Sequence, residues 1–201
     1  MKPKFVRRYD FRQPLDDMWE AIPEKGWSFD MAPGQAHFVN PTDAKAEIYL
    51  RPCSVYGDRI EFQLVPGSRK AGVFAFGFLA GFEFISMALN LDTGDLQVKT
   101  HEFHKAQPRL ADKAPTDFTR LAVVREQDRL PGLPYEGSKV TILCDDRPVA
   151  VVRHIDYLPE SLFMFGLWGR GEINLASFSI QGPARPQPEY VRVGIWQQTI
   201  K

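Results

Sequence analysis

Alternation with a period of two is the feature that most restricts what this chain can fold into. In residues 59–64, RIEFQL, large apolar residues alternate with charged or amide residues. Such a pattern is typical of a strand with one face buried and the other in solvent. Helical periodicity is confined to residues 14–25, where Pro14 and Pro23 limit any helix to a turn or two. The sequence therefore predicts an all-β protein.

Strand-like segments separated by Gly, Pro, Asn or Asp recur along the chain. We expect strands at residues 4–11, 35–40, 46–52, 58–65, 72–79, 82–91, 95–103, 118–125, 138–144, 148–153, 162–168, 172–181 and 190–196. Open sheets of about a dozen twisted strands rarely stay single, so we expect a two-sheet antiparallel β-sandwich of the jelly-roll kind. We assign residues 1–201 to one such domain.

Three short segments predict where the chain reverses. Residues 145–146, DD, separate two apolar runs, and residues 92–95, DTGD, supply the glycine that a tight reversal needs. Residues 169–171, GRG, would turn the chain into its final sandwich strand. In that strand the apolar positions change parity between Leu175 and Phe178, which predicts a β-bulge between them.

Lysine plus arginine and aspartate plus glutamate both number 25, so the formal net charge is zero. Nothing in this balance favours nucleic acid or an anionic membrane, and we expect neither as a partner. The longest apolar run, residues 71–82, is too short and too rich in glycine to span a bilayer. Residues 1–14 hold basic residues with no apolar segment behind them. We therefore expect a cytoplasmic protein, or a secreted one if a leader has been removed.

Cys53 and Cys144 each stand at the end of an apolar run. That position favours buried thiols over a disulfide framework, although a single bridge between them stays open. Two cysteines without Cys-x-x-Cys spacing do not make the usual structural zinc site.

The order of several segments resembles the concanavalin A-like lectin/glucanase superfamily, particularly its laminin-G-like and 3-keto-disaccharide-hydrolase-like branches. The segments that carry the resemblance are residues 9–21, 26–40, 71–78, 82–98, 139–152 and 161–183. The resemblance covers most of the chain and implies a jelly roll that recognises a glycan on its concave sheet. Members include lectins, glycoside hydrolases and polysaccharide lyases, and fold alone does not choose among them. The Glu-x-Asp-x-x-Glu strand of laminarinase-type enzymes is missing here.

Strand parity indicates which face could bind that glycan, because residues opposite the core-facing set point toward solvent. The outward-facing set is Glu47, Tyr49, Arg51, Glu61, Gln63, Gln97, Lys99, His101 and Phe103. Amides, cations and carboxylates bind hydroxyl groups, and Tyr49 or Trp168 could stack on a sugar ring. We select Tyr49, Arg51, Gln63, Lys99, Trp168 and Arg170 as ligand-binding candidates. The alternative is an ordinary solvated sheet face.

Three residues are candidates for acid–base chemistry: Glu61, Glu83 and His101. Glu83 has the parity of core-facing residues, so it is either a strand end or an acid near a site. His101 and His104 are three positions apart and point to opposite faces of a strand, so we expect no metal site there. We expect no cofactor, and a bound calcium ion stays open.

The leading hypothesis is a carbohydrate-binding or carbohydrate-processing domain whose partner is an oligosaccharide or polysaccharide. A second hypothesis makes it a glycoside hydrolase or lyase that uses Glu61 or Glu83 with His101, so whether it is an enzyme stays open. A third makes it a structural or interaction domain without a small ligand, because residues 73–84, VFAFGFLAGFEF, look like exposed aromatic surface. The oligomeric state and the identity of the glycan stay open.

Overall fold

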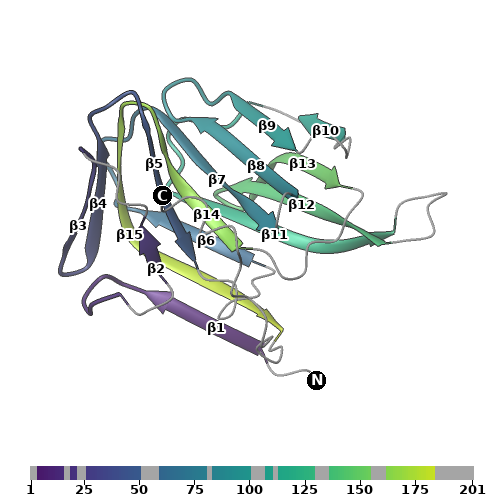
Figure 1. The fold of residues 1–201 in the computed structure, drawn as a ribbon, viewed down its shortest axis with the longest axis horizontal. Coiled ribbons are helices and arrows are strands. Elements are labelled where there is room, and N and C mark those ends of the chain that lie inside the picture. Colours follow the sequence, from purple (N-terminus) through teal and green to yellow (C-terminus); the bar gives the residue numbers. More distant parts are fainter. Residues whose placement is uncertain are drawn as a thin grey trace, which may run out of the picture.

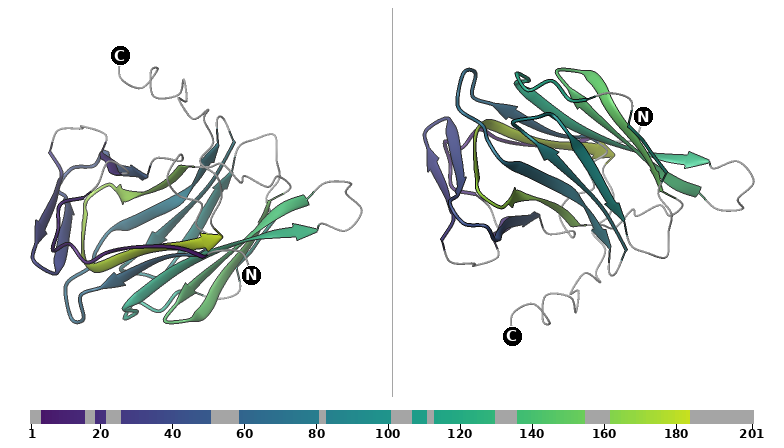
Figure 2. Two further views of the ribbon diagram at one scale, coloured as in Figure 1. Left: turned by 90° about the horizontal axis from the view of Figure 1, so that it is seen from below. Right: turned by 90° about the horizontal axis from the view of Figure 1, so that it is seen from above.

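A computed structural model of the chain describes residues 4–15, 19–21, 26–50, 59–80, 83–100, 107–110, 113–129, 136–154 and 162–183. These residues form two antiparallel β-sheets that pack face to face (Figure 1, Figure 2). This confirms the predicted all-β, two-sheet sandwich.

One sheet has nine strands and the other has six. The nine-stranded sheet contains β1 (Lys4–Tyr9), β3 (Ser28–Ala32), β4 (Gln35–Asn40), β6 (Arg59–Leu64), β10 (Gln107–Leu110), β11 (Arg120–Arg129), β12 (Glu136–Cys144), β13 (Arg147–His154) and β15 (Gly171–Pro183). The six-stranded sheet contains β2 (Trp19–Ala21), β5 (Lys45–Leu50), β7 (Val73–Ala80), β8 (Glu83–Asn90), β9 (Leu96–Thr100) and β14 (Leu162–Trp168).

The last two strands interleave with earlier ones. β14 lies between β5 and β7 in the six-stranded sheet, whereas β15 lies between β4 and β6 in the nine-stranded sheet. The chain therefore passes from one sheet to the other repeatedly, and strands far apart in sequence become neighbours. This interleaving is the connectivity of a jelly roll.

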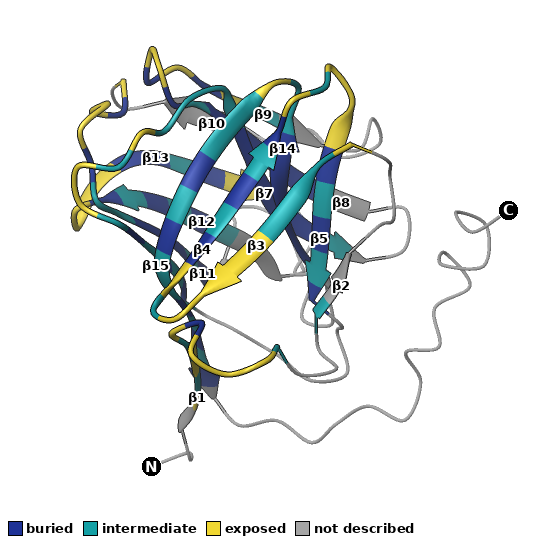
Figure 3. Ribbon diagram, turned by 90° about the vertical axis from the view of Figure 1, so that its left-hand side faces the viewer, coloured by how far each residue is buried: buried dark blue, intermediate teal, exposed yellow. Residues whose placement is uncertain are grey.

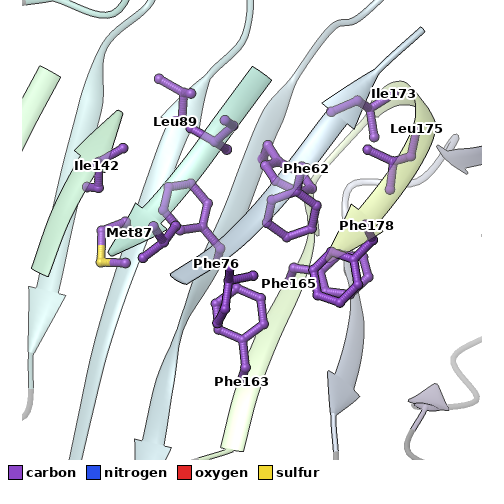
Figure 4. Close-up of a cluster of buried hydrophobic side chains, with 14 of the residues drawn as sticks. Phe62, Phe76, Met87, Leu89, Ile142, Phe163, Phe165, Ile173, Leu175 and Phe178 are labelled. Carbon is purple, nitrogen blue, oxygen red and sulfur yellow. The ribbon is translucent and has the colours of Figure 1, made fainter. Parts of the chain in front are cut away.

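The core between the sheets is aromatic at its centre (Figure 4). Phe62 and Phe178 come from the nine-stranded sheet and Phe165 from the six-stranded sheet, and all three are fully buried. The ring centroids of Phe62 and Phe178 are 4.9 Å apart, and those of Phe62 and Phe165 are 5.2 Å apart. Edge-to-face and tilted aromatic pairs stabilise a core beyond the area that they bury. Contacts of this kind hold the two sheets together.

The predicted alternation is confirmed along β4, β5 and β6, where every second residue is buried. Figure 3 shows the same alternation of buried and partly exposed residues along the strands. The aromatic residues of β7 were expected to form an exposed surface. Phe74, Phe76 and Phe78 are instead buried and point into the core. For these residues that expectation is wrong, because the small residues between them face outward instead.

Most predicted strands are found within two residues of their expected ends. The prediction missed β2, β3 and β10, and β2 lies where a helical turn was considered. β2 is short and exists through pairing with β5, which local sequence does not reveal. The expected strand at residues 190–196 lies outside the described residues.

The predicted reversals are confirmed. Asp145 and Asp146 have φ angles of 47° and 64°, as a two-residue hairpin turn between β12 and β13 requires. The Asp145 carboxylate accepts hydrogen bonds from the backbone N–H groups of Thr119 and Arg120, which fixes this turn against the start of β11. The pairing register of β15 with β6 shifts between Leu175 and Ser177, so the predicted bulge is also confirmed.

Cys144 is a free, buried thiol, and burial raises its pKa to about 12. The prediction of a buried thiol is confirmed for Cys144, whereas Cys53 lies outside the described residues. Within the described ranges, no helix is long and apolar enough to cross a membrane.

Candidate functional site

The predicted ligand-binding residues do not share one face. Tyr49 on β5 and Trp168 on β14 belong to the six-stranded sheet, whereas Glu61 and Gln63 on β6 belong to the nine-stranded sheet. Each side chain points away from the core, as parity predicted, but a sandwich has two outer faces and β5 and β6 lie in different sheets. The prediction of one common face is therefore wrong.

Glu61 lies in an ion pair on the outer face of the nine-stranded sheet. The Arg59 guanidinium donates from Nε and Nη2 to Glu61 Oε2 at 3.0 and 2.8 Å, and Arg59 also contacts Asp146 at 3.3 Å. Gln63 donates to the backbone oxygen of Thr119 at 3.2 Å. Glu83 belongs to the other sheet, so Glu61 and Glu83 do not form an acid–base pair on one outer face.

The remaining candidates are placed only in part. Lys99 pairs with Ser86 in the register of β8 and β9, and the Glu83 position pairs with Ala80, but the side chains of Lys99 and Glu83 are outside the described part of the structure. Arg51, His101, Phe103 and His104 lie outside the described residues altogether.

Arg170 lies at the exposed turn between β14 and β15. Its Nε donates to Asp43 Oδ1 at 3.0 Å, and both side chains are largely exposed. An ion pair in solvent contributes little to stability, and the candidacy of Arg170 as a ligand-binding residue stays a prediction.

A cluster of polar and aromatic side chains occupies the outer face of β5 and β14. Tyr49 Oη donates to Glu47 Oε2 at 2.5 Å, and Trp168 Nε1 donates to Glu47 Oε1 at 2.8 Å. The Lys45 ammonium lies 4.0 Å from the centroid of the Trp168 ring. We call these four residues the Glu47 cluster. Both carboxylate oxygens accept a hydrogen bond, so the carboxylate is held in one orientation.

Strand geometry explains why these four residues meet. Lys45, Glu47 and Tyr49 alternate along β5 and therefore point to one side. Trp168 pairs directly with Lys45, and Gly166 pairs with Glu47. Gly166 has no side chain, which lets β14 approach the backbone of β5 closely at Glu47.

A buried asparagine fixes the end of β14 at this cluster. Asn40 Nδ2 donates to the backbone oxygens of Ala44 and Gly169 at 2.7 and 3.0 Å. Asn40 Oδ1 accepts from the backbone and the hydroxyl of Thr42 at 3.1 and 2.8 Å. The amide thereby ties the turn before β5 to the residue that follows Trp168, and these bonds set where the indole lies.

Small residues continue the same outer face across the middle of the six-stranded sheet. We call them the outer strip: Gly166, Ala75, Gly77, Ser86 and Ala88. Ala75 is fully buried, and Ser86 and Ala88 are 6% and 7% exposed. The Ser86 hydroxyl has no hydrogen bond among the described residues and lies on the β8 side of the strip, where Ser86 pairs with Gly77.

Both glycines of the strip allow close approach of neighbouring strands. A Cβ atom on Gly166 would lie 2.1 Å from the backbone oxygen of Ala46, and one on Gly77 would lie 2.3 Å from that of Ile85. Real Cβ atoms do not come so close to a backbone oxygen, so these positions require glycine.

Sequence reasoning placed Glu47 in the outward set but did not select it, and it missed Lys45 and Ser86. The spacing of Lys45, Glu47 and Tyr49 indicates that these three residues share one face of a strand, so this part of the cluster could have been predicted. The hydrogen bond from Trp168 to Glu47 could not be predicted from the sequence, because it depends on the pairing of β5 with β14.

The described side chains on this face offer hydrogen-bonding groups, a cation and an aromatic ring. Among the strand residues of this sheet whose side chains are described, Glu47 is the one carboxylate, so no pair of carboxyl groups for glycosidic cleavage is seen there. No group of three or more metal-ligating side chains occurs in the described parts of the chain.

The fold defines the class as a two-sheet antiparallel β-sandwich with jelly-roll connectivity, the fold class expected from the sequence. No protein-family model and no curated protein matches the chain. Among solved structures, it is similar to apo Crh5 transglycosylase, with 16% identity and a TM-score of 0.49, over 90% of this chain and 85% of that chain.

Two further structures are similar at lower scores. Crh5 transglycosylase in complex with NAG has 16% identity and a TM-score of 0.45, over 90% of this chain and 85% of that chain. The carbohydrate recognition domain of Emp46p in its potassium-bound form has 10% identity and a TM-score of 0.42, over 86% of this chain and 94% of that chain. At these scores we transfer no residue role from any of them.

Proposed function

We propose that this protein binds an oligosaccharide or polysaccharide on the outer face of the six-stranded sheet, at the Glu47 cluster and the outer strip. The observation that carries the proposal is the oriented Glu47 carboxylate on the same face as a strip of small residues, whose hydroxyl group, that of Ser86, has no hydrogen-bond partner among the described residues.

Small residues let a flat ligand approach a sheet closely, and a sugar ring would reach the strip at Ser86 and Ala88, which keep 6% and 7% exposure, since Ala75 is fully buried. A sugar ring has an apolar face of C–H groups and a rim of hydroxyls, so it needs both contact area and hydrogen-bonding groups. The Ser86 hydroxyl can donate and accept, and the Glu47 carboxylate can accept from a sugar hydroxyl. Trp168 supplies an aromatic group at the side of the strip.

Calorimetric titration against a panel of neutral and uronic-acid oligosaccharides tests the proposal. We expect at least one oligosaccharide to bind, and we expect Ala88→Leu to abolish that binding because the larger side chain would fill the strip. Glu61→Gln is the matched control, since it alters a carboxylate on the opposite sheet and should leave affinity unchanged. Thermal unfolding confirms that each variant is folded.

Two results would contradict the proposal. One is that no saccharide in the panel binds the unmodified protein. The other is that a saccharide binds equally well to the folded Ala88→Leu variant, which would place the site elsewhere on the molecule.

A further inference from the structure

The position of Lys45 bears on which saccharide the site would accept. The Lys45 side chain is exposed, and its ammonium lies 4.0 Å from the Trp168 ring centroid. No ion pair of Lys45 is found within the described part of the chain. The Trp168 ring thus has the Lys45 ammonium over one face, and that ammonium has no anionic partner among the described residues.

A sugar that stacks on this face of Trp168 must displace the Lys45 ammonium. Displacement removes a cation–π contact, which is unfavourable for a neutral sugar. A sugar that bears a carboxylate can pair with the displaced ammonium and recover the lost interaction as a charge-assisted hydrogen bond. The same lysine therefore opposes a neutral ligand and favours an acidic one.

The Glu47 carboxylate does not remove this preference. Its two oxygens already accept hydrogen bonds from Tyr49 and Trp168, which spread its charge toward those donors. It meets the indole at Nε1, on the ring edge, whereas Lys45 lies over the ring. A ligand carboxylate at Lys45 and a ligand hydroxyl at Glu47 are thus compatible.

We propose that Lys45 is a specificity-determining residue that makes the site selective for acidic saccharides, those built from uronic acids, over neutral ones. The inference rests on the proposed function and specifies its substrate class. It requires only that Lys45 moves from the Trp168 ring to the ligand.

The experiment compares uronic-acid oligosaccharides with their methyl esters, which have the same backbone without the charge. We expect the unmodified protein to bind the acid about tenfold more tightly than the ester at low salt. In Lys45→Gln this ratio should fall to about one, with the ester bound as tightly as before or more tightly. Lys139→Gln, which removes the same charge from the nine-stranded sheet, should keep the ratio.

The outcomes separate the two proposals. Equal binding of acid and ester by the unmodified protein would overturn the selectivity and leave saccharide binding intact. A preference for the acid that persists in Lys45→Gln would overturn the role of Lys45. If no acid, no ester and no neutral oligosaccharide bound the unmodified protein, the proposed function itself would be overturned.

Discussion

Trp168 donates a hydrogen bond of 2.8 Å from its indole Nε1 to Glu47 Oε1, and the two residues are 121 positions apart in the sequence. The bond exists because β14 inserts beside β5, so that the last strand of the six-stranded sheet lies next to one formed early in the chain. The residues that we assign to the site are therefore assembled by the jelly-roll connectivity.

Replacing Glu47 by Gln should weaken both the cluster and ligand binding. The amide oxygen can accept from Trp168 and the amide nitrogen can donate to the Tyr49 hydroxyl, but both hydrogen bonds lose the charge that the carboxylate supplies. We expect the free energy of unfolding to fall by about 1 kcal/mol and saccharide affinity to fall about tenfold. Urea unfolding and calorimetry measure the two effects.

Glu61→Gln is the comparison for this variant. It removes a carboxylate that pairs with Arg59 on the other sheet, so saccharide affinity should not change. A larger loss of affinity in Glu61→Gln than in Glu47→Gln would show that the nine-stranded sheet carries the site.

Adding a methyl group at Gly166 should destabilise the six-stranded sheet. The new Cβ would lie 2.1 Å from the backbone oxygen of Ala46, so β5 and β14 must separate. We expect Gly166→Ala to lower the free energy of unfolding by about 2 to 3 kcal/mol, the scale of strain from overpacking. Chemical denaturation measures the loss.

Gly169→Ala provides a contrast for the Gly166 variant. Gly169 has a φ angle of 82° and nothing within 4 Å of a Cβ, so its substitution carries the backbone cost alone, about 1 kcal/mol. If Gly166→Ala proved no more destabilising than Gly169→Ala, the close approach of the strands would not be the reason for glycine.

Asn40→Ala should be among the most disruptive polar substitutions. Asn40 is 1% exposed, and its amide bonds link Thr42 and Ala44 to the end of β14. Loss of the amide removes hydrogen bonds to part-buried backbone groups of Thr42, Ala44 and Gly169, which costs about 2 to 3 kcal/mol in total. Thermal unfolding of Asn40→Ala measures the loss of stability. Asn174→Ala is the control, because the Asn174 side chain has no hydrogen bond among the described residues. Equal losses of stability in the two variants would contradict the prediction.

The Cys144 thiol should make stability fall at high pH. Its pKa is raised from 9.0 to about 12 because it is buried, so the folded state keeps a proton that the unfolded state loses. The resulting stability is fully present below pH 9 and is lost as the pH rises from 9 toward 12. The slope reaches about 1.4 kcal/mol per pH unit at most.

Urea unfolding between pH 8 and pH 10.5 measures that slope, with Cys144→Ala as the reference. The reference variant is expected to be less stable at pH 8 because of the cavity, but its stability should fall less steeply with pH. Parallel slopes in the two proteins would mean that Cys144 does not ionise differently in the folded and unfolded states.

The sequence determined the local features of this protein. Alternation in β4, β5 and β6 predicted which side chains are buried, because a strand repeats every two residues whatever its partners are. The chain reversal at Asp145 and Asp146 and the bulge between Leu175 and Ser177 were also predicted, since turn chemistry and parity are properties of short segments. Those features are enough to specify a two-sheet sandwich.

Only the tertiary structure decided which outward-facing residues lie together. Glu47 and Glu61 have the same parity and are close in sequence, but β5 and β6 enter different sheets and the two carboxylates face opposite sides of the molecule. Parity distinguishes inside from outside, whereas the choice of sheet depends on strand pairing between distant segments. That pairing brings Trp168 to Glu47 and leaves Glu61 on the other side, because burial of the aromatic core fixes the order of strands and the outer faces follow from it.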